Sequence, residues 1–340
     1  MTRYLKLKKS NCKNCYKCIR HCPVKSIKFS NHQANIVDDE CILCGQCFVN
    51  CPQNAKEIRN DTEAARALIA SGAPVYVSLA PSFVANYPGV GIGAMEKALQ
   101  KLGFAAVEET AIGATLVKRE YERLVKEGEQ EVIISSCCHS VNLLIQKYYP
   151  EALPYLAKVE SPMLAHCRLI KEQHPGAKTV FIGPCISKKA EAETYAGIVD
   201  CVLTFEELQG MFEAKQIDFD TVEEQDYLNE GTGAGRGFAV SGGVAKAVTD
   251  LVHEQYPDME IQTARAEGLR ECRKLMMLAK AGKFKGCLLE GMACPGGCVA
   301  GAGTILPVDK AAKLVEKYSR EAAAASPVES AYSDRGESLE

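Results

Sequence analysis

The sequence lacks the features that would place it in several common classes of protein. Its apolar runs all fall well short of the roughly 20 residues that a membrane-spanning helix needs, so we expect no membrane partner. Lys and Arg number 40 and Asp and Glu number 43, so there is no basic excess of the kind that binds nucleic acid. The N-terminal residues MTRYLKLKKSNCKNC are basic but have no apolar core. We therefore expect no signal peptide and a cytoplasmic location.

Histidine is also sparse, whereas cysteine is abundant. The six histidines are scattered, and no His-x-x-x-His pair suggests zinc. Of the 17 cysteines, eight fall within the first 51 residues and the next is Cys137. Disulfide-rich secreted domains are much shorter than this chain, so we interpret the cysteines as reduced thiols and their grouping as metal binding. The break in cysteine content predicts a domain boundary near residues 55–64.

The first 51 residues contain an internal repeat. Each copy has the pattern Cys-x-x-Cys-x-x-Cys-x-x-x-Cys-Pro, in which three thiolates bind one 4Fe–4S cluster and the fourth binds the neighbouring cluster. The predicted ligands are Cys12, Cys15, Cys18 and Cys51 for cluster one, and Cys41, Cys44, Cys47 and Cys22 for cluster two. Zinc knuckles or disulfides are the alternatives, but zinc needs isolated sets of four cysteines. The segment resembles a bacterial two-cluster ferredoxin, which implies a one-electron relay.

The rest of the chain alternates between short apolar runs and helical patterns. Strands are predicted over residues 75–80, 131–135, 179–183, 199–204 and 285–289. Helices are predicted over 94–102, ending at Gly103, and over 114–127. Buried runs that alternate with helices are typical of parallel α/β architecture. We therefore predict an α/β protein with a small α+β ferredoxin domain (1–60), a domain of parallel sheets flanked by helices (61–320) and a flexible tail (321–340).

Cysteine and proline follow most of the predicted strands. The residues after the strands are Pro81 and Ser82, Cys137 and Cys138, Pro184 and Cys185, and the loop from Cys294 to Cys298. Because open parallel sheets bind ligands beyond the carboxyl ends of their strands, these residues are expected to converge in one crevice. The two glycines between Cys294 and Cys298 let the backbone approach a bulky inorganic ligand. The sequence therefore predicts a third iron–sulfur cluster between the strand ends.

Three of these loops resemble the signature loops of the FeFe-hydrogenases. They are S-S-C-C at 135–138, G-P-C-I-S-K-K at 183–189 and E-G-M-A-C-P-G-G-C at 290–298. Their order and spacing fit that family, and A-P-S at 80–82 and F-A-V-S-G-G-V at 238–244 match two further family segments. The resemblance extends over residues 10–310 and implies the two-lobed hydrogenase fold. It also implies heterolytic cleavage and formation of dihydrogen at an H-cluster, with electrons relayed through the N-terminal clusters.

The resemblance implies a set of cofactor ligands. The H-cluster joins a 4Fe–4S cubane to a diiron azadithiolate subsite with CO and CN ligands, which maturation proteins supply. The implied cubane ligands are Cys138, Cys185, Cys294 and Cys298, with Cys298 bridging to the diiron subsite. The implied contacts of that subsite are Lys188, Pro81, Ser82, Phe238 and Met292. A solvated lysine beside Lys189 is the alternative for Lys188.

The proton route departs from that of the well-studied catalytic members of the family. Cys137 keeps the thiol that passes protons in the family, but two glutamates and a serine of the usual route fall on Tyr121, Leu124 and Ala157. Leucine and alanine cannot exchange protons, so we expect low turnover. The candidates for another route are Tyr121, Cys201 and Glu290. A salt-bridged structural acid is the alternative for Glu290. This pattern resembles the divergent, sensory members of the family.

Two other functions stay open. One is a non-catalytic hydrogen or redox sensor that signals through a separate partner. The other is an iron–sulfur assembly factor of the hydrogenase-like type, which binds cubanes but no diiron subsite; retention of Cys137 and Lys188 argues against it. The expected partners are dihydrogen, protons, an electron acceptor or signalling partner, and maturation proteins. The cysteines predicted to be only small buried apolar residues are Cys167, Cys201, Cys272 and Cys287.

Overall fold

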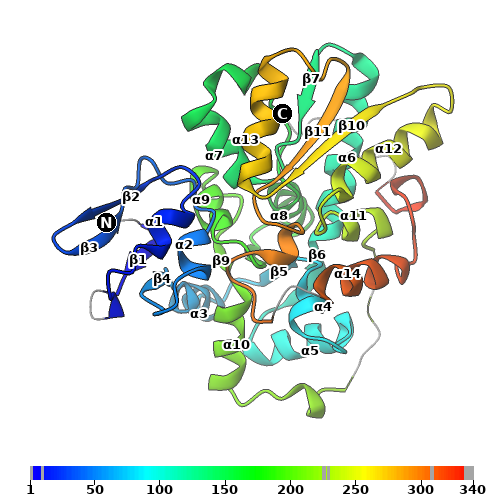
Figure 1. Ribbon diagram of the computed structural model, residues 1–340. Coiled ribbons are helices and arrows are strands. Elements are labelled where there is room, and N and C mark those ends of the chain that lie inside the picture. Colours follow the sequence, from blue (N-terminus) through cyan, green and yellow to red (C-terminus); the bar gives the residue numbers. More distant parts are fainter. Residues whose placement is uncertain (1–2, 9–10, 224–226, 228–229, 307–309, 333–340) are drawn as a thin grey trace.

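The N-terminal segment of the computed structural model consists of two antiparallel strand pairs and two short helices. The structure describes residues 3–8, 11–223, 227, 230–306 and 310–332. The elements of this segment are β1 (Leu5–Leu7), α1 (Lys17–His21), β2 (Ile27–Ser30), β3 (Gln33–Ile36), α2 (Gln46–Val49) and β4 (Lys56–Ile58). Strand β1 pairs with β4, and β2 forms a hairpin with β3. Figure 1 shows this segment at one side of the larger domain.

Two parallel sheets form the core of the larger domain. The first has the strand order β6-β5-β8-β9 and the second β10-β11-β7. All neighbouring strands in both sheets are parallel. The strands are β5 (Val75–Leu79), β6 (Ala106–Glu109), β7 (Val132–Ile134), β8 (Lys178–Ile182), β9 (Cys201–Leu203), β10 (Gln262–Glu267) and β11 (Cys287–Met292). The predicted α/β architecture of two lobes with parallel sheets is confirmed (Figure 1).

Helices cover the faces of both sheets. They are α3 (Thr62–Ala70), α4 (Phe83–Asn86), α5 (Ile92–Leu102), α6 (Thr110–Glu127), α7 (His139–Tyr148), α8 (Pro162–Gln173), α9 (Ser187–Thr194), α10 (Phe205–Ala214), α11 (Gly233–Gly237), α12 (Gly243–Gln255), α13 (Leu269–Lys280) and α14 (Ala311–Arg320). Both predicted helices are present as α5 and α6. Helix α5 ends at Gly103, whose φ of 106° closes the last turn in the left-handed region. Helix α6 begins four residues earlier than predicted, because β6 leads directly into it at Thr110.

The edge strand β10 was not predicted from the sequence, and its composition explains why. Its residues Q-T-A-R-A-E contain no apolar run, and only Ala266 is buried. The strand forms because its backbone pairs in parallel with β11 over six residues. A pattern of apolar side chains cannot reveal a strand that is held by backbone pairing at the edge of a sheet.

Residues 321–332, the first part of the predicted flexible tail, make hydrogen bonds to other parts of the chain. The backbone N–H of Gly233 in α11 donates to the Ala324 carbonyl at 2.8 Å. Tyr332 is buried, and its hydroxyl donates to Glu230 at 2.7 Å. Small and polar side chains suggested flexibility here, and that remains a prediction; the structure adds hydrogen bonds between this segment and α11. Residues 333–340 lie outside the described residues.

Candidate metal centre

The two copies of the cysteine repeat adopt the same backbone turns. Asn14 and Tyr16 in the first copy, and Leu43 and Gly45 in the second, have φ values of 55°, 58°, 56° and 73°. Such turns direct backbone N–H groups into a concave site that suits an anion. Glycine is required at position 45 because a Cβ there would lie 2.3 Å from the Cβ of Ala302. The side chain of Tyr16 at the equivalent position is instead 42% exposed.

The four cysteines predicted for cluster two surround one small cavity. Cys22, Cys41, Cys44 and Cys47 line a space of about 10 Å³ together with apolar side chains. Burial raises the pKa of the Cys47 thiol to about 12. Such thiols stay protonated until a metal cation displaces the proton, and this linkage is usual at thiolate metal sites. The arrangement suits thiolates that share one cluster.

The cysteines predicted for cluster one lie nearer the surface. Burial raises the pKa of Cys18, and the neighbouring thiols of Cys51 and Cys12 add to that shift. The Cys15 thiol is partly exposed and donates to Gln53 Oε1 at 3.7 Å. The repeat thus places one cysteine set against the larger domain and the other toward the outer edge of the N-terminal segment.

The cysteines that follow the strands meet at a second cavity. Cys138 follows β7, Cys185 follows β8, and Cys294 and Cys298 follow β11, and all four line a space of about 30 Å³. Cys44 of the second repeat lines the same space and also the cavity of cluster two. The carboxyl ends of strands from both sheets therefore bring together cysteines that are far apart in the sequence.

The loop between Cys294 and Cys298 depends on its glycines. Gly296 and Gly297 have φ values of 82° and 97°. A Cβ on Gly297 would lie 2.6 Å from the backbone nitrogen of Ser241, so no side chain fits there. Burial raises the pKa of both Cys294 and Cys298. This close packing holds the two thiols against the cavity in a dry environment.

Among the described residues, no group of three or more His, Cys, Asp or Glu side chains is placed to hold one metal ion. Each thiolate of a four-iron cluster binds a different iron, so these thiolates stand farther apart than the ligands of one zinc ion. Zinc, the alternative raised by the sequence, would need its four ligands around one ion.

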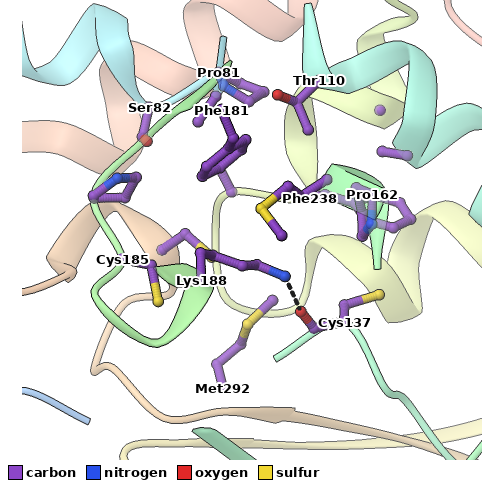
Figure 2. A pocket seen from close by; sticks show the side chains of 17 residues that line it. Pro81, Ser82, Thr110, Cys137, Pro162, Phe181, Cys185, Lys188, Phe238 and Met292 are labelled. Carbon is purple, nitrogen blue, oxygen red and sulfur yellow. Dashed lines mark hydrogen bonds between the residues drawn. The ribbon is translucent and has the colours of Figure 1, made fainter. Parts of the chain in front are cut away.

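A larger cavity of about 80 Å³ adjoins the third cysteine set (Figure 2). Cys185, Cys298 and Met292 line both cavities. The residues that the resemblance implied for the diiron subsite all line this larger cavity: Pro81, Ser82, Lys188, Phe238 and Met292. Most of the other walls are apolar, so any polar group inside is largely shielded from water.

Two polar side chains in the larger cavity suit an anionic guest. The Ser82 hydroxyl is buried and has no hydrogen-bond partner among the residues that the structure describes. An unsatisfied buried hydroxyl costs about 1–3 kcal/mol, which a bound acceptor would offset. Burial alone would lower the pKa of Lys188, but the Glu191 carboxylate, together with Cys185 and Cys298, outweighs burial and raises it. Lys188 therefore stays cationic, and its Nζ donates to the Cys137 carbonyl at 3.4 Å (Figure 2).

Cys137 and Tyr121 lie together at the edge of this cavity. The Tyr121 hydroxyl lies 3.8 Å from Cys137 Sγ and 2.9 Å from Ser136 Oγ, and it accepts the backbone N–H of Ser136 at 2.7 Å. Ser136 Oγ in turn donates to the Val159 carbonyl at 2.6 Å. Burial raises the pKa of Cys137 to about 12, although the Tyr121 hydrogen bond and the Lys188 charge oppose that shift. The structure therefore brings these two candidates together.

The other two candidates for a proton route lie elsewhere. The Glu290 carboxylate accepts the backbone N–H groups of Gly242 at 2.7 Å and Ala245 at 2.8 Å, at the start of α12. Glu290 therefore caps α12. This role is structural, as in the alternative raised by the sequence, but its partners are backbone N–H groups rather than a salt-bridged cation. Cys201 lies on β9 with its thiol 3.8 Å from the Asp61 carbonyl, and it is not among the described residues that line the larger cavity.

Several wall residues and one charged partner were not assigned from the sequence. Among them are Thr110, Ala114, Pro162, Phe181 and Glu191. The ring of Phe181 occupies space that a side chain at Gly183 would need, since a Cβ there would lie 2.7 Å from the ring. Glu191 stands three residues after Lys188 on α9, so helical spacing was the one signal that could have paired them.

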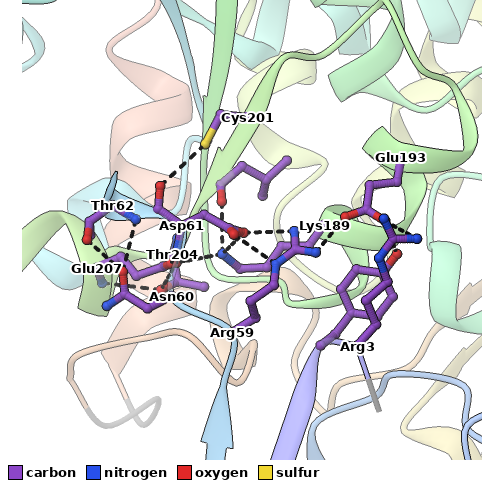
Figure 3. A network of polar contacts seen from close by, with 12 residues as sticks. Arg3, Arg59, Asn60, Asp61, Thr62, Lys189, Glu193, Cys201, Thr204 and Glu207 are labelled. Atoms are coloured by element: carbon purple, nitrogen blue, oxygen red, sulfur yellow. Dashed lines mark hydrogen bonds and ion pairs between the residues drawn. The ribbon is translucent and has the colours of Figure 1, made fainter. Parts of the chain in front are cut away.

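An ionic network joins the N-terminal segment to the larger domain (Figure 3). Lys189, fully buried, donates to Asp61 at 2.7 Å, to Glu207 at 2.9 Å and to the Val202 carbonyl at 2.9 Å. Arg59, just after β4, pairs with both Asp61 and Glu193. Adjacent lysines thus have separate tasks: Lys188 faces the cavity, whereas Lys189 holds the junction.

Comparison with known proteins gives two family matches. The family described as "Iron only hydrogenase large subunit, C-terminal domain" matches residues 73–302, and the 4Fe-4S dicluster domain matches residues 4–52. Among solved structures, a variant of the FeFe-hydrogenase HydA1 from Chlamydomonas reinhardtii is similar in fold. Its TM-score is 0.65 at 22% identity, over 82% of this chain and 95% of that one. No helix among the described residues is long and apolar enough to span a membrane.

Three relatives show the breadth of the similarity. The periplasmic Fe hydrogenase large subunit of Nitratidesulfovibrio vulgaris is 30% identical over 69% of this chain and 68% of that protein. The NADP-reducing hydrogenase subunit HndD of Solidesulfovibrio fructosivorans is 29% identical over 80% of this chain, which spans only 57% of HndD. The cytosolic Fe-S cluster assembly factor NAR1 of Eremothecium gossypii is 28% identical over 53% of this chain and 43% of that protein.

Proposed function

The chain belongs to the iron-only hydrogenase family, and from that premise we propose that it cleaves and forms dihydrogen slowly at an H-cluster. The observation that carries the proposal is the position of Cys298, which lines both the cavity of the third cysteine set and the larger cavity. A residue at that boundary can bridge a cubane to a second metal unit. The low rate and a sensory role are parts of the same proposal.

The N-terminal clusters form the proposed electron route. Cys44 lines the cavity of cluster two and that of the third set, so clusters held there would have one protein residue between them. Gly45 packs against Ala302 at the same contact and keeps the two domains close. The route would then run from the third set through cluster two to cluster one near the surface.

The larger cavity would hold the diiron subsite through few contacts. Bound there, the subsite supplies the metal at which dihydrogen is split and an amine that takes up a proton. Cys298 would be its thiolate tether, while the unpartnered Ser82 hydroxyl and the Lys188 ammonium would bind its anionic ligands. The apolar side chains of Phe238 and Met292 exclude water from this space.

Proton transfer is proposed to pass through Cys137 to the Tyr121 hydroxyl, 3.8 Å away. Beyond Tyr121, the described hydrogen bonds run to Ser136 and end at the Val159 carbonyl, which cannot pass a proton on. Leu124 and Ala157, at the positions of the usual relay, carry no exchangeable proton. A route with this gap supports a slow enzyme whose main output is a report of hydrogen or redox state.

The test begins with protein made without maturation proteins. Reconstitution with iron and sulfide should give about twelve iron atoms per chain, because three 4Fe–4S clusters are expected. Addition of a synthetic diiron azadithiolate complex should then produce infrared bands of carbonyl and cyanide, together with slow dihydrogen oxidation by a viologen. The Cys298→Ala variant should lose the bands, whereas Cys287→Ala, outside the cavities, should keep them.

Each result separates the candidate functions. Bands with turnover support the proposed enzyme. Bands that respond to dihydrogen without turnover would assign the chain to non-catalytic sensing. Loading of all three 4Fe–4S clusters with no infrared bands would assign the chain to the assembly-factor class. The similarity to NAR1 is the reason to test this outcome. Loading of four iron atoms or fewer would contradict all three.

A further inference from the structure

Charge is distributed unevenly along the chain. Residues 1–37 contain nine basic residues and no acidic one, although the whole chain has a formal net charge of -3. The remaining residues carry 31 basic and 43 acidic residues. The positive charge is therefore concentrated in the segment that holds the first cysteine repeat.

Four of these basic residues lie between or just after the cysteines of the first repeat and have no carboxylate partner in the described part of the chain. They are Lys13, Lys17, Arg20 and Lys25. Lys25 Nζ donates to the Arg20 carbonyl at 3.2 Å, so these two lie together. Lys8 and Lys28, by contrast, pair with Glu57 and Glu40. The unpaired charges thus gather around the proposed cluster one.

Two exposed aromatic side chains adjoin these charges. Tyr16, next to Cys15, and Phe29, on the β2–β3 hairpin, are 42% and 43% exposed, and their ring centroids lie 5.0 Å apart. Figure 1 shows this hairpin projecting away from the larger domain. Exposed aromatic rings bordered by charge are typical of the centre of a protein–protein contact. We call the four cations with Tyr16 and Phe29 the basic face.

We propose that the basic face is the docking surface for a small acidic protein that carries one electron, and this inference rests on the electron relay of the proposed function. Positive charge steers an acidic partner toward the face, and the aromatic pair supplies the apolar contact that holds it. The step is a single electron transfer: the reduced carrier loses one electron and the oxidised cluster one gains it, with no bond formed and no proton moved. Cys15, a proposed ligand of cluster one, is partly exposed and directly precedes Tyr16.

The test uses the full chain loaded with its 4Fe–4S clusters, so it needs no diiron subsite. A reduced plant-type 2Fe–2S ferredoxin, which is acidic, is mixed anaerobically with the oxidised protein, and its reoxidation is followed at several ionic strengths. The combined variant Lys13→Glu, Lys17→Glu and Lys25→Glu should lower the second-order rate constant at least about tenfold at low salt. It should also remove most of the salt dependence.

The matched control reverses three exposed lysines on the larger domain, Lys101→Glu, Lys215→Glu and Lys283→Glu, none of which has an ion pair in the described part of the chain. It changes the net charge equally and should leave the ferredoxin rate within about twofold. Reduction by a net-neutral sulfonated viologen should be unchanged in both combined variants. Equal slowing in the two, or no slowing in either, overturns the proposal.

The aromatic pair gives a second, independent measurement. Phe29→Ser should raise the ferredoxin concentration needed for half-saturation about threefold or more, with the salt dependence kept. Met277→Ser, on the exposed face of α13, is the control and should change nothing. If the Lys13, Lys17 and Lys25 reversals changed only the self-association of the chain, the face would bind a second copy and the proposal would fail. Failure of the clusters to load would instead contradict the proposed function.

Discussion

Two buried serines near the site differ in what satisfies their hydroxyl groups. Ser136 Oγ donates to the Val159 carbonyl at 2.6 Å and contacts the Tyr121 hydroxyl. Ser82 Oγ is just as buried and has no partner among the described residues. A buried hydroxyl that lacks a partner is destabilising, and an acceptor bound in the cavity would offset that cost. Ser136 instead fixes the loop that carries the cysteine pair.

Tyr121→Phe tests the proposed proton route. The substitution removes the hydroxyl next to Cys137 and keeps the ring, so we expect dihydrogen oxidation with a viologen to fall by about tenfold or more. The solvent deuterium isotope effect on turnover should rise, while the infrared bands of the loaded protein stay in place. Tyr87→Phe is the control, because that buried hydroxyl donates to the Phe205 carbonyl outside the site. Unchanged turnover in Tyr121→Phe would remove this residue from the route.

The pH dependence of the Glu290→Gln variant distinguishes a helix-capping role of Glu290 from a role in proton transfer. Burial raises the pKa of Glu290 above its ordinary 4.5 despite the two backbone hydrogen bonds. A carboxyl with a raised pKa adds stability below its ordinary pKa and loses it as pH rises through the shifted pKa. The free energy of unfolding of the wild type should therefore fall, relative to Glu290→Gln, as pH rises from about 4.5 toward neutrality.

Denaturant titrations between about pH 5 and pH 8 measure this difference. Glu151→Gln is the control, because Lys280 lowers the pKa of the exposed Glu151 and its titration lies below that range. Dihydrogen oxidation and its pH profile should be unchanged in Glu290→Gln, since the carboxylate faces α12. A changed profile would return Glu290 to the proton route.

Helices α6 and α8 pack closely enough to require a glycine between them. A Cβ on Gly113 of α6 would lie 2.1 Å from the Pro162 carbonyl oxygen and 2.7 Å from the His166 Cβ, both on α8. These contacts are with backbone and with the base of a side chain, which cannot move aside easily. Pro162 and Met163 at the start of α8 line the larger cavity, so this packing also sets its shape.

Gly113→Ala should lower the free energy of unfolding by about 3 kcal/mol, because the added methyl forces the two helices apart. Gly210→Ala on α10 is the matched control, since no atom lies within 4 Å of a Cβ there. Alanine in that open helical position should stabilise the protein by about 0.5–1 kcal/mol. Urea-induced unfolding of the cluster-loaded protein gives both values. Equal effects would mean that the two helices can separate without cost.

The two domains are joined by charges that lie inside the protein. Lys189 is fully buried and pairs with the carboxylates of both Asp61 and Glu207. Glu207 also accepts the Thr204 backbone N–H at the start of α10, so the junction extends into the larger domain. Asp61 also pairs with Arg59, just after β4, so this buried network continues to the N-terminal segment.

Lys189→Met should lower the free energy of unfolding by about 3–5 kcal/mol, because the buried Glu207 carboxylate loses its counter-ion and Asp61 keeps only Arg59. Lys246→Met, which breaks an exposed pair with Asp250, should cost less than about 1 kcal/mol. Combining Lys189→Met with Glu207→Gln should cost less than the sum of the single changes, since one carboxylate charge is gone. Additive losses would show that Lys189 does not act through Glu207.

The sequence by itself determined the features that depend on the spacing and polarity of neighbouring residues. The cysteine repeat, the strand β8 and the loop from Cys294 to Cys298 can be predicted because chain geometry limits what a few consecutive residues can do. The resemblance of the loops to a known family extended this to a proposed set of ligands for three clusters. These assignments needed no knowledge of which distant segments touch.

The tertiary structure alone decided which distant residues meet. Spacing could not show that Cys44 would share a cavity with Cys298, that the Tyr121 hydroxyl would reach Cys137, or that Glu290 would cap α12. Strand β10 and the packing of Tyr332 were missed for the same reason. Such contacts depend on how sheets and helices pack against one another. No run of neighbouring residues encodes that packing, because its free energy is shared among side chains that only the fold brings together.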